Sequence, residues 1–282
     1  MVMIRLLKIL FVFSAIILHA GCADTQKKAD TKGIKIGDLA PAGKRAQPQV
    51  LHTTNIEVIH YELPAENIAS LDGIWRMLDS GSMRYNDPNS FAANGLRAAM
   101  GKFATFDKVS EKLKSANATK LYTTSLLMSD NQPELLRITR IPHKTIISYI
   151  DRQGAVKNAE VGPGIAGLQV LASQILSSSM SPRTDGANSS AVSIRQLASI
   201  RVTPAILAET EGVAPALAER IRENDLRISS AGISAIMKPG DFVMLCPREY
   251  KPNEITAADR FFIKPGPKPA IRVFLLVCVS IF

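Results

Sequence analysis

The chain has 282 residues, of which 46% are hydrophobic and 21% charged. These values are ordinary for a globular protein and exclude a fibrous, collagen-like or wholly disordered chain. Three cysteines are too few for a disulfide scaffold, and 6% aromatic residues argue against a surface that binds sugars or nucleic acids by stacking. The net charge is +9, and the basic stretch between residues 23 and 50 suits contact with anionic headgroups or cell-wall polymer.

The chain begins like an export signal. Arg5 and Lys8 flank the start of an unbroken apolar run at residues 9–18. A helix rises about 1.5 Å per residue, so this run is too short for the roughly 30 Å of a bilayer's hydrocarbon core. We therefore expect residues 1–21 to be a signal peptide rather than a membrane-spanning helix.

Small residues lead from this run into a cysteine, in the order His19-Ala20-Gly21-Cys22. The segment resembles the lipobox of bacterial lipoproteins, in which the cysteine is lipidated and becomes the mature N-terminus, although His19 departs from the small or aliphatic residue usual there. The resemblance implies acyl chains such as palmitate on Cys22. Two or three chains, at about 0.8 kcal/mol per buried CH₂ group, would bind the protein to the bilayer permanently. Such lipoproteins stay at the inner membrane when Asp follows the cysteine, so Ala23 favours the outer membrane, facing the periplasm.

Residues 22–54 are expected to be a flexible basic tether. Six basic and three acidic side chains stand between residues 23 and 50, with Gly and Pro but almost no large apolar residues. Such a segment cannot bury enough apolar surface to order itself. A nucleic-acid partner is excluded by the export compartment rather than by charge.

The folded body is expected to start at residue 55 with an α+β half, residues 55–178. Composition predicts a strand at 56–63, and apolar spacings of three and four predict helices at 64–78 and 106–116. Turn signals then separate short strands at 121–128, 134–141, 144–151, 155–161 and 165–172. Because the connections are short, we expect an antiparallel meander packed on the helices.

Residues 179–191 are rich in Ser and are expected to form a loop before a second β-rich half, residues 192–282, with one or two helices. Strands are predicted at 192–202, 232–237, 241–246 and 270–282, with helical pieces after Thr203-Pro204 and from Pro215 to Asn224. The last strand is apolar on both faces, which indicates the centre of a core rather than a membrane-barrel strand ending at Phe282. The predicted fold class is α+β, mainly antiparallel sheet packed with a few short helices.

The sequence contains no recognisable catalytic site, cofactor site or metal site. Residues 162–167 spell G-x-G-x-x-G, but no buried strand precedes them and no helix follows, so we interpret them as a glycine-proline turn between strands. Ser234 falls short of the G-x-S-x-G motif of hydrolases. Glu219 and Glu223 read as a solvated helix face beside two arginines. The histidines that follow the signal lack metal-binding spacing: His52, His60 and His143.

Cys246 and Cys278 both lie in apolar strand segments. Free cysteine packs well as a small hydrophobic residue. Export compartments are oxidising, so a disulfide between Cys246 and Cys278 is the alternative, provided that their Cα atoms lie about 4.4 to 6.8 Å apart.

Two resemblances concern the body. Trp75, the segment Phe91-Ala92-Ala93-Asn94-Gly95-Leu96-Arg97 and the ending at residues 239–245 resemble uncharacterised exported proteins and lipoproteins of planctomycete-type bacteria. That family has no established activity, so the resemblance implies location alone. Lys238-Pro239-Gly240-Asp241, followed by an apolar strand, is similar to the sheet domains of secretin-type export channels.

These patterns favour a lipid-anchored, periplasm-facing binding or assembly protein without a catalytic site. Its partners would be the bilayer, through acylated Cys22, and an unknown protein or other component of the cell envelope. Two alternatives stay open: an exported hydrolase whose site is assembled from distant segments, and a component associated with a secretin.

Overall fold

The computed structural model describes residues 52–180, 192–210, 225–252 and 256–282, all within one unit, residues 50–282. Two six-stranded sheets hold most of these residues, and all of their described strand pairs are antiparallel. Sheet A has the order β3 (Leu96–Gly101), β12 (Phe242–Pro247), β14 (Ala270–Ile281), β1 (Thr53–Pro64) and β4 (Thr119–Ser129), with β13 (Ile263–Lys264) also beside β14. Sheet B has the order β2 (Met83–Tyr85), β11 (Ile233–Met237), β9 (Val192–Ala208), β8 (Gly164–Met180) and β5 (Pro133–Ile141), with β10 (Leu226–Arg227) also beside β9. A separate hairpin joins β6 (Thr145–Ile150) to β7 (Val156–Val161).

The described helices are short. They are the 3-10 segments η2 (Ala65–Leu71) and η3 (Ser229–Ala231) and the α-helices α2 (Asp72–Trp75), α3 (Pro88–Ala93), α4 (Phe103–Ser115) and α6 (Ala257–Phe262). Local sequence explains where α3 begins, because Pro88 occupies its first turn and the Asp87 carboxylate accepts a hydrogen bond from the Ser90 backbone N–H. The expected class, mainly antiparallel sheet with a few short helices, is therefore confirmed, with sheet more dominant than helix.

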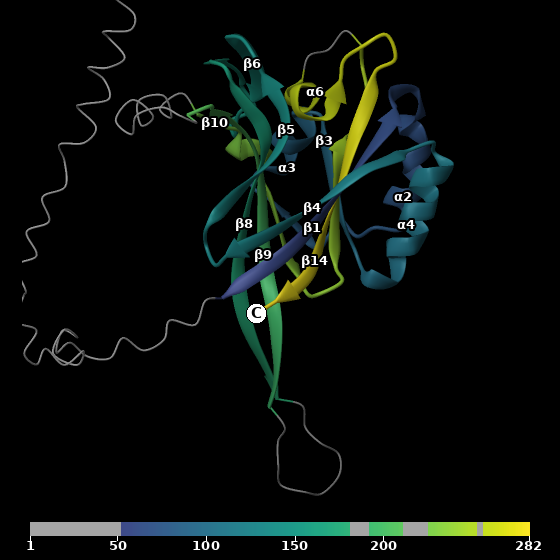
Figure 1. Ribbon diagram of the computed structural model, residues 1–282, viewed down its shortest axis with the longest axis vertical. Helices are drawn as coiled ribbons and strands as arrows, with labels where there is room; N and C mark the ends of the chain where they lie inside the picture. The colour runs from purple at the N-terminus through teal and green to yellow at the C-terminus, as the bar shows by residue number, and fades with distance from the viewer. Residues whose placement is uncertain (1–51, 181–191, 211–224, 253–255) are drawn as a thin grey trace, which may run out of the picture. The chain divides into compact units, whose positions relative to one another are not determined.

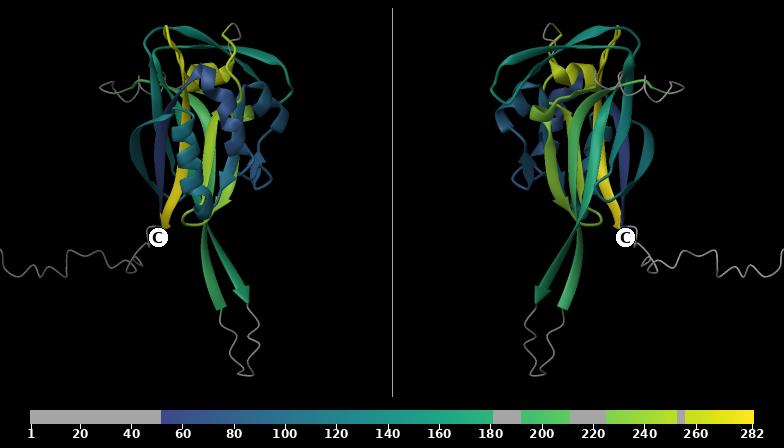
Figure 2. Two further views of the ribbon diagram at one scale, coloured as in Figure 1. Left: turned by 90° about the vertical axis from the view of Figure 1, so that its right-hand side faces the viewer. Right: turned by 90° about the vertical axis from the view of Figure 1, so that its left-hand side faces the viewer.

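Sheet A is the middle of three layers, between sheet B and the layer of η2, α2 and α4 (Figure 1). Side chains alternate along a strand, so Val243 and Leu245 face sheet B while Phe242 and Met244 face the helices. Burial on both faces explains why β12 and β14 read as continuous apolar segments. The prediction that residues 270–282 form a core strand is confirmed, since β14 lies at the centre of sheet A (Figure 2).

Segments expected in separate halves pair with each other. Strand β1 pairs with β14 in sheet A, and β2 pairs with β11 in sheet B. The Ser-rich segment also begins within a strand, because β8 continues to Met180 and pairs with β9 along its whole length, and residues 181–191 lie outside the described residues. The strands of residues 55–178 and 192–282 therefore share both sheets.

Two local expectations need correction. The meander forms only in part: β6 pairs with β7 as expected, but β4 pairs with β1 and β5 pairs with β8. Thr203 and Pro204 lie in β9 rather than at a helix start; Pro204 falls where the neighbour of β9 changes from β11 to β10, so its missing N–H breaks no continuous ladder. Lys238-Pro239-Gly240 forms a tight turn between β11 and β12, and this turn carries the chain from sheet B to sheet A. The helix expected at Pro215–Asn224 lies outside the described residues.

Candidate functional site

The G-x-G-x-x-G letters form a turn and the start of a strand. Gly162 lies between β7 and β8, whereas Gly164 and Gly167 lie within β8. A Cβ atom on Gly164 would come within 2.5 Å of the Leu207 carbonyl oxygen, and one on Gly167 within 2.3 Å of the Leu136 carbonyl oxygen. Both glycines thus serve close strand packing. The predicted turn between strands is confirmed at residues 162–163, whereas residues 164–167 belong to β8.

His60 is a core residue of β1. Its ring stacks on Phe274 at a centroid distance of 4.7 Å and meets Tyr122 edge-on at 4.8 Å. Neither ring nitrogen has a hydrogen-bond partner among the described residues. Burial, reinforced by the nearby Arg272 guanidinium, lowers the pKa of His60 to about 4. His60 is therefore neutral at pH 7 and lacks the carboxylate and serine that a hydrolytic triad requires.

The remaining candidate residues are scattered. His52 and His143 are exposed, the latter between β5 and β6, and Ser234 is half-buried in β11. Cys22, Glu219 and Glu223 lie outside the described residues. Within the described ranges, three or more His, Cys, Asp or Glu side chains nowhere gather as a metal site would require. The helices of those ranges are also all too short or too polar to cross a bilayer.

The alternative of a disulfide between Cys246 and Cys278 is not supported. Both thiols are free and buried. Cys278 pairs through its backbone with Asp241, five residues before Cys246, which places the two cysteines about 17 Å apart along the sheet. They also face opposite sides of sheet A. The sequence showed that both strands are apolar but not how they are aligned.

An apolar hollow lies between α4 and the helix-facing side of sheet A. We name it the α4 groove; its volume is about 900 Å³. Ile59 and Tyr61 of β1 and Val277 and Val279 of β14 contribute from the sheet, while Phe103, Phe106, Ser110 and Lys114 contribute from α4. The residues that complete it are Glu57, Asp107, Lys120, Lys238, Pro239, Gly240 and Cys278. The groove exists because α4, 13 residues long, covers only part of a sheet face that is apolar well beyond it.

Two apolar side chains at the groove are left in solvent. Phe103, the first residue of α4, is 76% exposed, and Val279 is 43% exposed. Inside the groove, the Ser110 hydroxyl is buried without a hydrogen-bond partner among the described residues. An exposed apolar rim beside an unpartnered polar atom is typical of a surface that another molecule covers.

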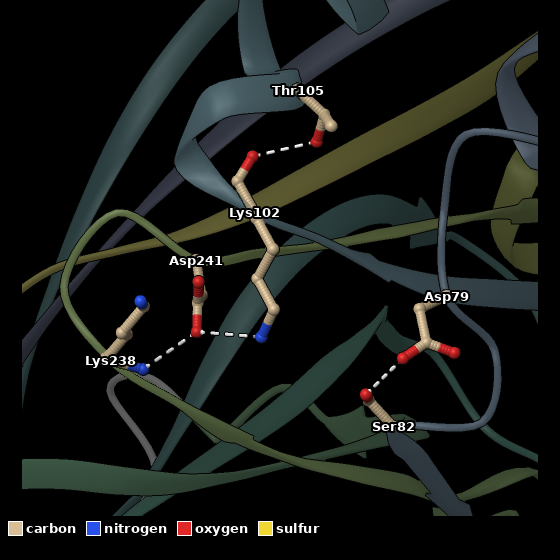
Figure 3. A network of polar contacts seen from close by, with 6 residues as sticks. All are labelled: Asp79, Ser82, Lys102, Thr105, Lys238 and Asp241. Atoms are coloured by element: carbon tan, nitrogen blue, oxygen red, sulfur yellow. Dashed lines mark hydrogen bonds and ion pairs between the residues drawn. The ribbon is translucent and has the colours of Figure 1, made fainter.

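A polar network fixes the loop at one end of the groove (Figure 3). The Asp241 carboxylate is 3% exposed and accepts hydrogen bonds from the Lys238 backbone N–H at 3.2 Å and the Lys102 ammonium at 3.4 Å. Gly240 in this turn has a φ of +89°, and a Cβ atom there would lie 3.1 Å from that of Phe103. Asp241 thus connects the 238–241 turn to the residue that precedes Phe103, and so holds the groove's mouth in place.

A second carboxylate, Asp79, lies in the same region but is already occupied (Figure 3). It accepts hydrogen bonds from the Ser82 hydroxyl and from the Gly81 N–H. These hydrogen bonds, chiefly the one from Ser82, lower the pKa of Asp79. Asp79 therefore stabilises its own turn, and the Lys102 ammonium forms its ion pair with Asp241.

Three exposed lysines stand around the apolar floor: Lys114, Lys120 and Lys238. None of their ammonium groups forms an ion pair within the described part of the chain. Glu57 and Asp107 are the acidic side chains of the groove. The groove thus presents an apolar centre with a small excess of positive charge at its border.

Comparison with known family models, with curated proteins and with solved structures gave no match. The sequence analysis also missed the α4 groove. Its predicted helix began at Phe106 and left out Phe103, and nothing local to Val279 or Lys238 indicates that these residues meet α4. The one usable signal was an aromatic residue, Phe103, directly after a lysine at a helix start.

Proposed function

We propose that this protein is a non-catalytic binding or assembly protein of the cell envelope, which holds a protein partner in the α4 groove. The observation that carries the proposal is the 76% exposure of Phe103 at the border of an apolar groove of about 900 Å³. Water-exposed aromatic residues at such sites commonly act as anchors for a partner. As an element of the same proposal, lipidated Cys22 attaches the protein to the outer membrane, facing the periplasm.

The charge of the groove indicates the chemistry of the partner. An apolar segment would cover Phe103 and Val279 and remove them from water, which contributes about 25 cal/mol per Å² of buried apolar surface. Acidic side chains beside that segment would meet Lys114, Lys120 and Lys238, whose ammonium groups form no ion pair among the described residues. The partner is therefore an apolar protein segment flanked by acidic residues.

A hydrolase is less well supported. General-base chemistry at His60 would need a hydrogen-bonded, accessible imidazole, whereas His60 is buried without a hydrogen-bond partner in the described residues. His143, which is exposed, has no hydrogen bond or ion pair within those residues either.

Photo-crosslinking in intact cells tests the groove. The full-length protein would carry p-benzoylphenylalanine in place of Phe103 or, as a control, in place of Ile146, which is 59% exposed on β6. We expect one reproducible adduct of defined mass from position 103 and none from position 146. The double variant Lys114→Glu, Lys238→Glu should weaken that adduct several-fold. Absence of the adduct, equal adducts at both positions, or an adduct insensitive to charge reversal would refute the proposal.

The anchor is tested separately. Cys22→Ser should abolish incorporation of labelled fatty acid and release the protein from the membrane fraction. Retention of the substituted protein on membranes after a high-salt wash would contradict the lipobox interpretation without bearing on the groove.

A further inference from the structure

Strand β4 forms an open edge of sheet A. It has 11 residues and pairs with β1 on one side. No described strand pairs with it on its other side, where the Ser129 carbonyl at the end of the strand accepts a hydrogen bond from the Gln132 N–H. Three of its apolar side chains are strongly exposed: Leu127 at 65%, Leu121 at 44% and Tyr122 at 43%. A long edge of this kind is a template for pairing with another strand.

The strands that end the other strand orders of sheets A and B are protected. On β3, Met100 exchanges both backbone hydrogen bonds with Asp79, and the Ala98 carbonyl accepts from the Tyr85 hydroxyl. On β5, Pro133 opens the strand, a bulge interrupts it, and three of its side chains are charged. Strand β2 has only three residues. Strand β4 contains no proline and a single charge, Lys120, so it lacks most of the devices that keep edges apart. Its bulge, opposite His60 and Tyr61, lies near one end.

The sequence of β4 is complementary to itself in the antiparallel direction. Pairing two copies about Thr124, the middle residue, would place Thr124 opposite Thr124 and Thr123 opposite Ser125. The same register would place Tyr122 opposite Leu126 and Leu121 opposite Leu127. The exposed apolar side chains would thus cover one another, hydroxyl side chains would meet hydroxyl side chains, and Lys120 would face Met128 rather than another charge. The regular part of this ladder runs from Tyr122 to Leu126, because β4 has its bulge at Leu121.

We infer that two copies of this chain associate through β4, antiparallel and centred on Thr124. The interface is isologous, because each copy contributes the same strand and a two-fold axis passes between the two Thr124 residues. The pairing joins both A sheets into one continuous sheet. It requires neither the α4 groove nor any particular partner in it.

Cysteine crosslinking in membranes of cells that produce the full-length protein tests this register. With Thr124→Cys, two cysteines face each other across the axis, within the 4.4 to 6.8 Å between Cα atoms that a disulfide needs. Mild oxidation should convert most of the protein into a covalent dimer on a non-reducing gel. Cys246 and Cys278 are buried and contribute no background. Leu127→Cys is the matched control, because its two copies would lie about 20 Å apart, six residues from alignment.

A second measurement covers the case in which Thr124→Cys fails to fold. When Leu121→Cys and Leu127→Cys chains are produced together with distinguishable tags, a crosslink should join one chain of each kind and neither chain to itself. The inference is overturned if the mixed crosslink is absent, if Leu127→Cys links to itself as readily as Thr124→Cys, or if folded Thr124→Cys stays monomeric.

Discussion

Gly101 and Phe242 face each other across β3 and β12, and a Cβ atom on Gly101 would come within 2.1 Å of the Phe242 ring. Phe242 is fully buried and meets Phe106 of α4 edge-on at 5.5 Å, so its ring cannot move without disturbing the α4 groove. We expect Gly101→Ala to lower the free energy of unfolding by about 1–3 kcal/mol in denaturant titrations, as overpacking does. Gly162→Ala is the control and should be nearly neutral, since nothing lies within 4 Å of its Cβ position. Equal losses of stability in the two variants would contradict the close contact between Gly101 and Phe242.

Stability should fall in mild acid because of His60. The pKa of His60 is about 4 in the folded chain and 6.5 when unfolded, so the unfolded state binds the proton first. The contribution of neutral His60 to the free energy of unfolding is complete above pH 6.5. It is lost as the pH falls toward 4, by about 3 kcal/mol. Denaturation midpoints between pH 7.5 and 4 should show this loss for the wild type and a flatter profile for His60→Phe. Parallel profiles for the wild type and His60→Phe would mean that groups other than His60 cause the pH dependence.

Both buried cysteines should resist modification in the folded protein. Burial raises the pKa of Cys246, and raises that of Cys278 to about 11, so neither thiolate forms at neutral pH. An alkylating reagent should label both residues only after unfolding without reductant, as mass spectrometry of the peptides would show. A disulfide-linked pair of peptides containing Cys246 and Cys278 would contradict the strand register.

Asp241 should matter more for stability than its ion-pair partner. Asp241→Ala leaves the part-buried Lys238 N–H without its acceptor, which costs about 1–3 kcal/mol. Lys102→Ala should cost less than about 1 kcal/mol, because the Lys102 side chain is 55% exposed. Measurements of the free energy of unfolding test this order. The loss for Asp241→Asn is expected to lie between the losses for the other two variants. A larger loss for Lys102→Ala would indicate that the ion pair holds the turn.

Removing the last strand should prevent folding. Truncation after Pro269 removes β14, which pairs with β1, β12 and β13 and has several fully buried side chains worth about 1.5–3 kcal/mol each. Cooperative unfolding should disappear, whereas deletion of residues 23–49 should leave the transition nearly unchanged. Calorimetry or far-ultraviolet circular dichroism distinguishes the two. A stable truncated protein would mean that β14 is not the centre of the core.

Local patterns were sufficient for the strands and insufficient for their partners. The composition of residues 56–63 predicted β1, and the two-sided apolar pattern of 270–282 predicted the buried position of β14. Nothing local states that β1 and β14 pair, because register depends on contacts between distant segments. The helix predicted after Thr203-Pro204 is wrong because these residues pair with β8, and this long-range pairing overrides the local helix preference. The α4 groove depends on Phe103, Val279 and Lys238 meeting in space, which one-dimensional spacing does not encode.

The pairing of β1 with β14 also dictates when the protein can fold. Strand β1 comes first in the described chain and β14 last, yet they are neighbours over most of their length. On a ribosome, β1 can pair with β4 early but waits for β14 until residues 270–281 have been made, and such distant pairings form slowly. During that interval the apolar face of β1 has no cover, so the nascent chain depends on whatever else can shield it.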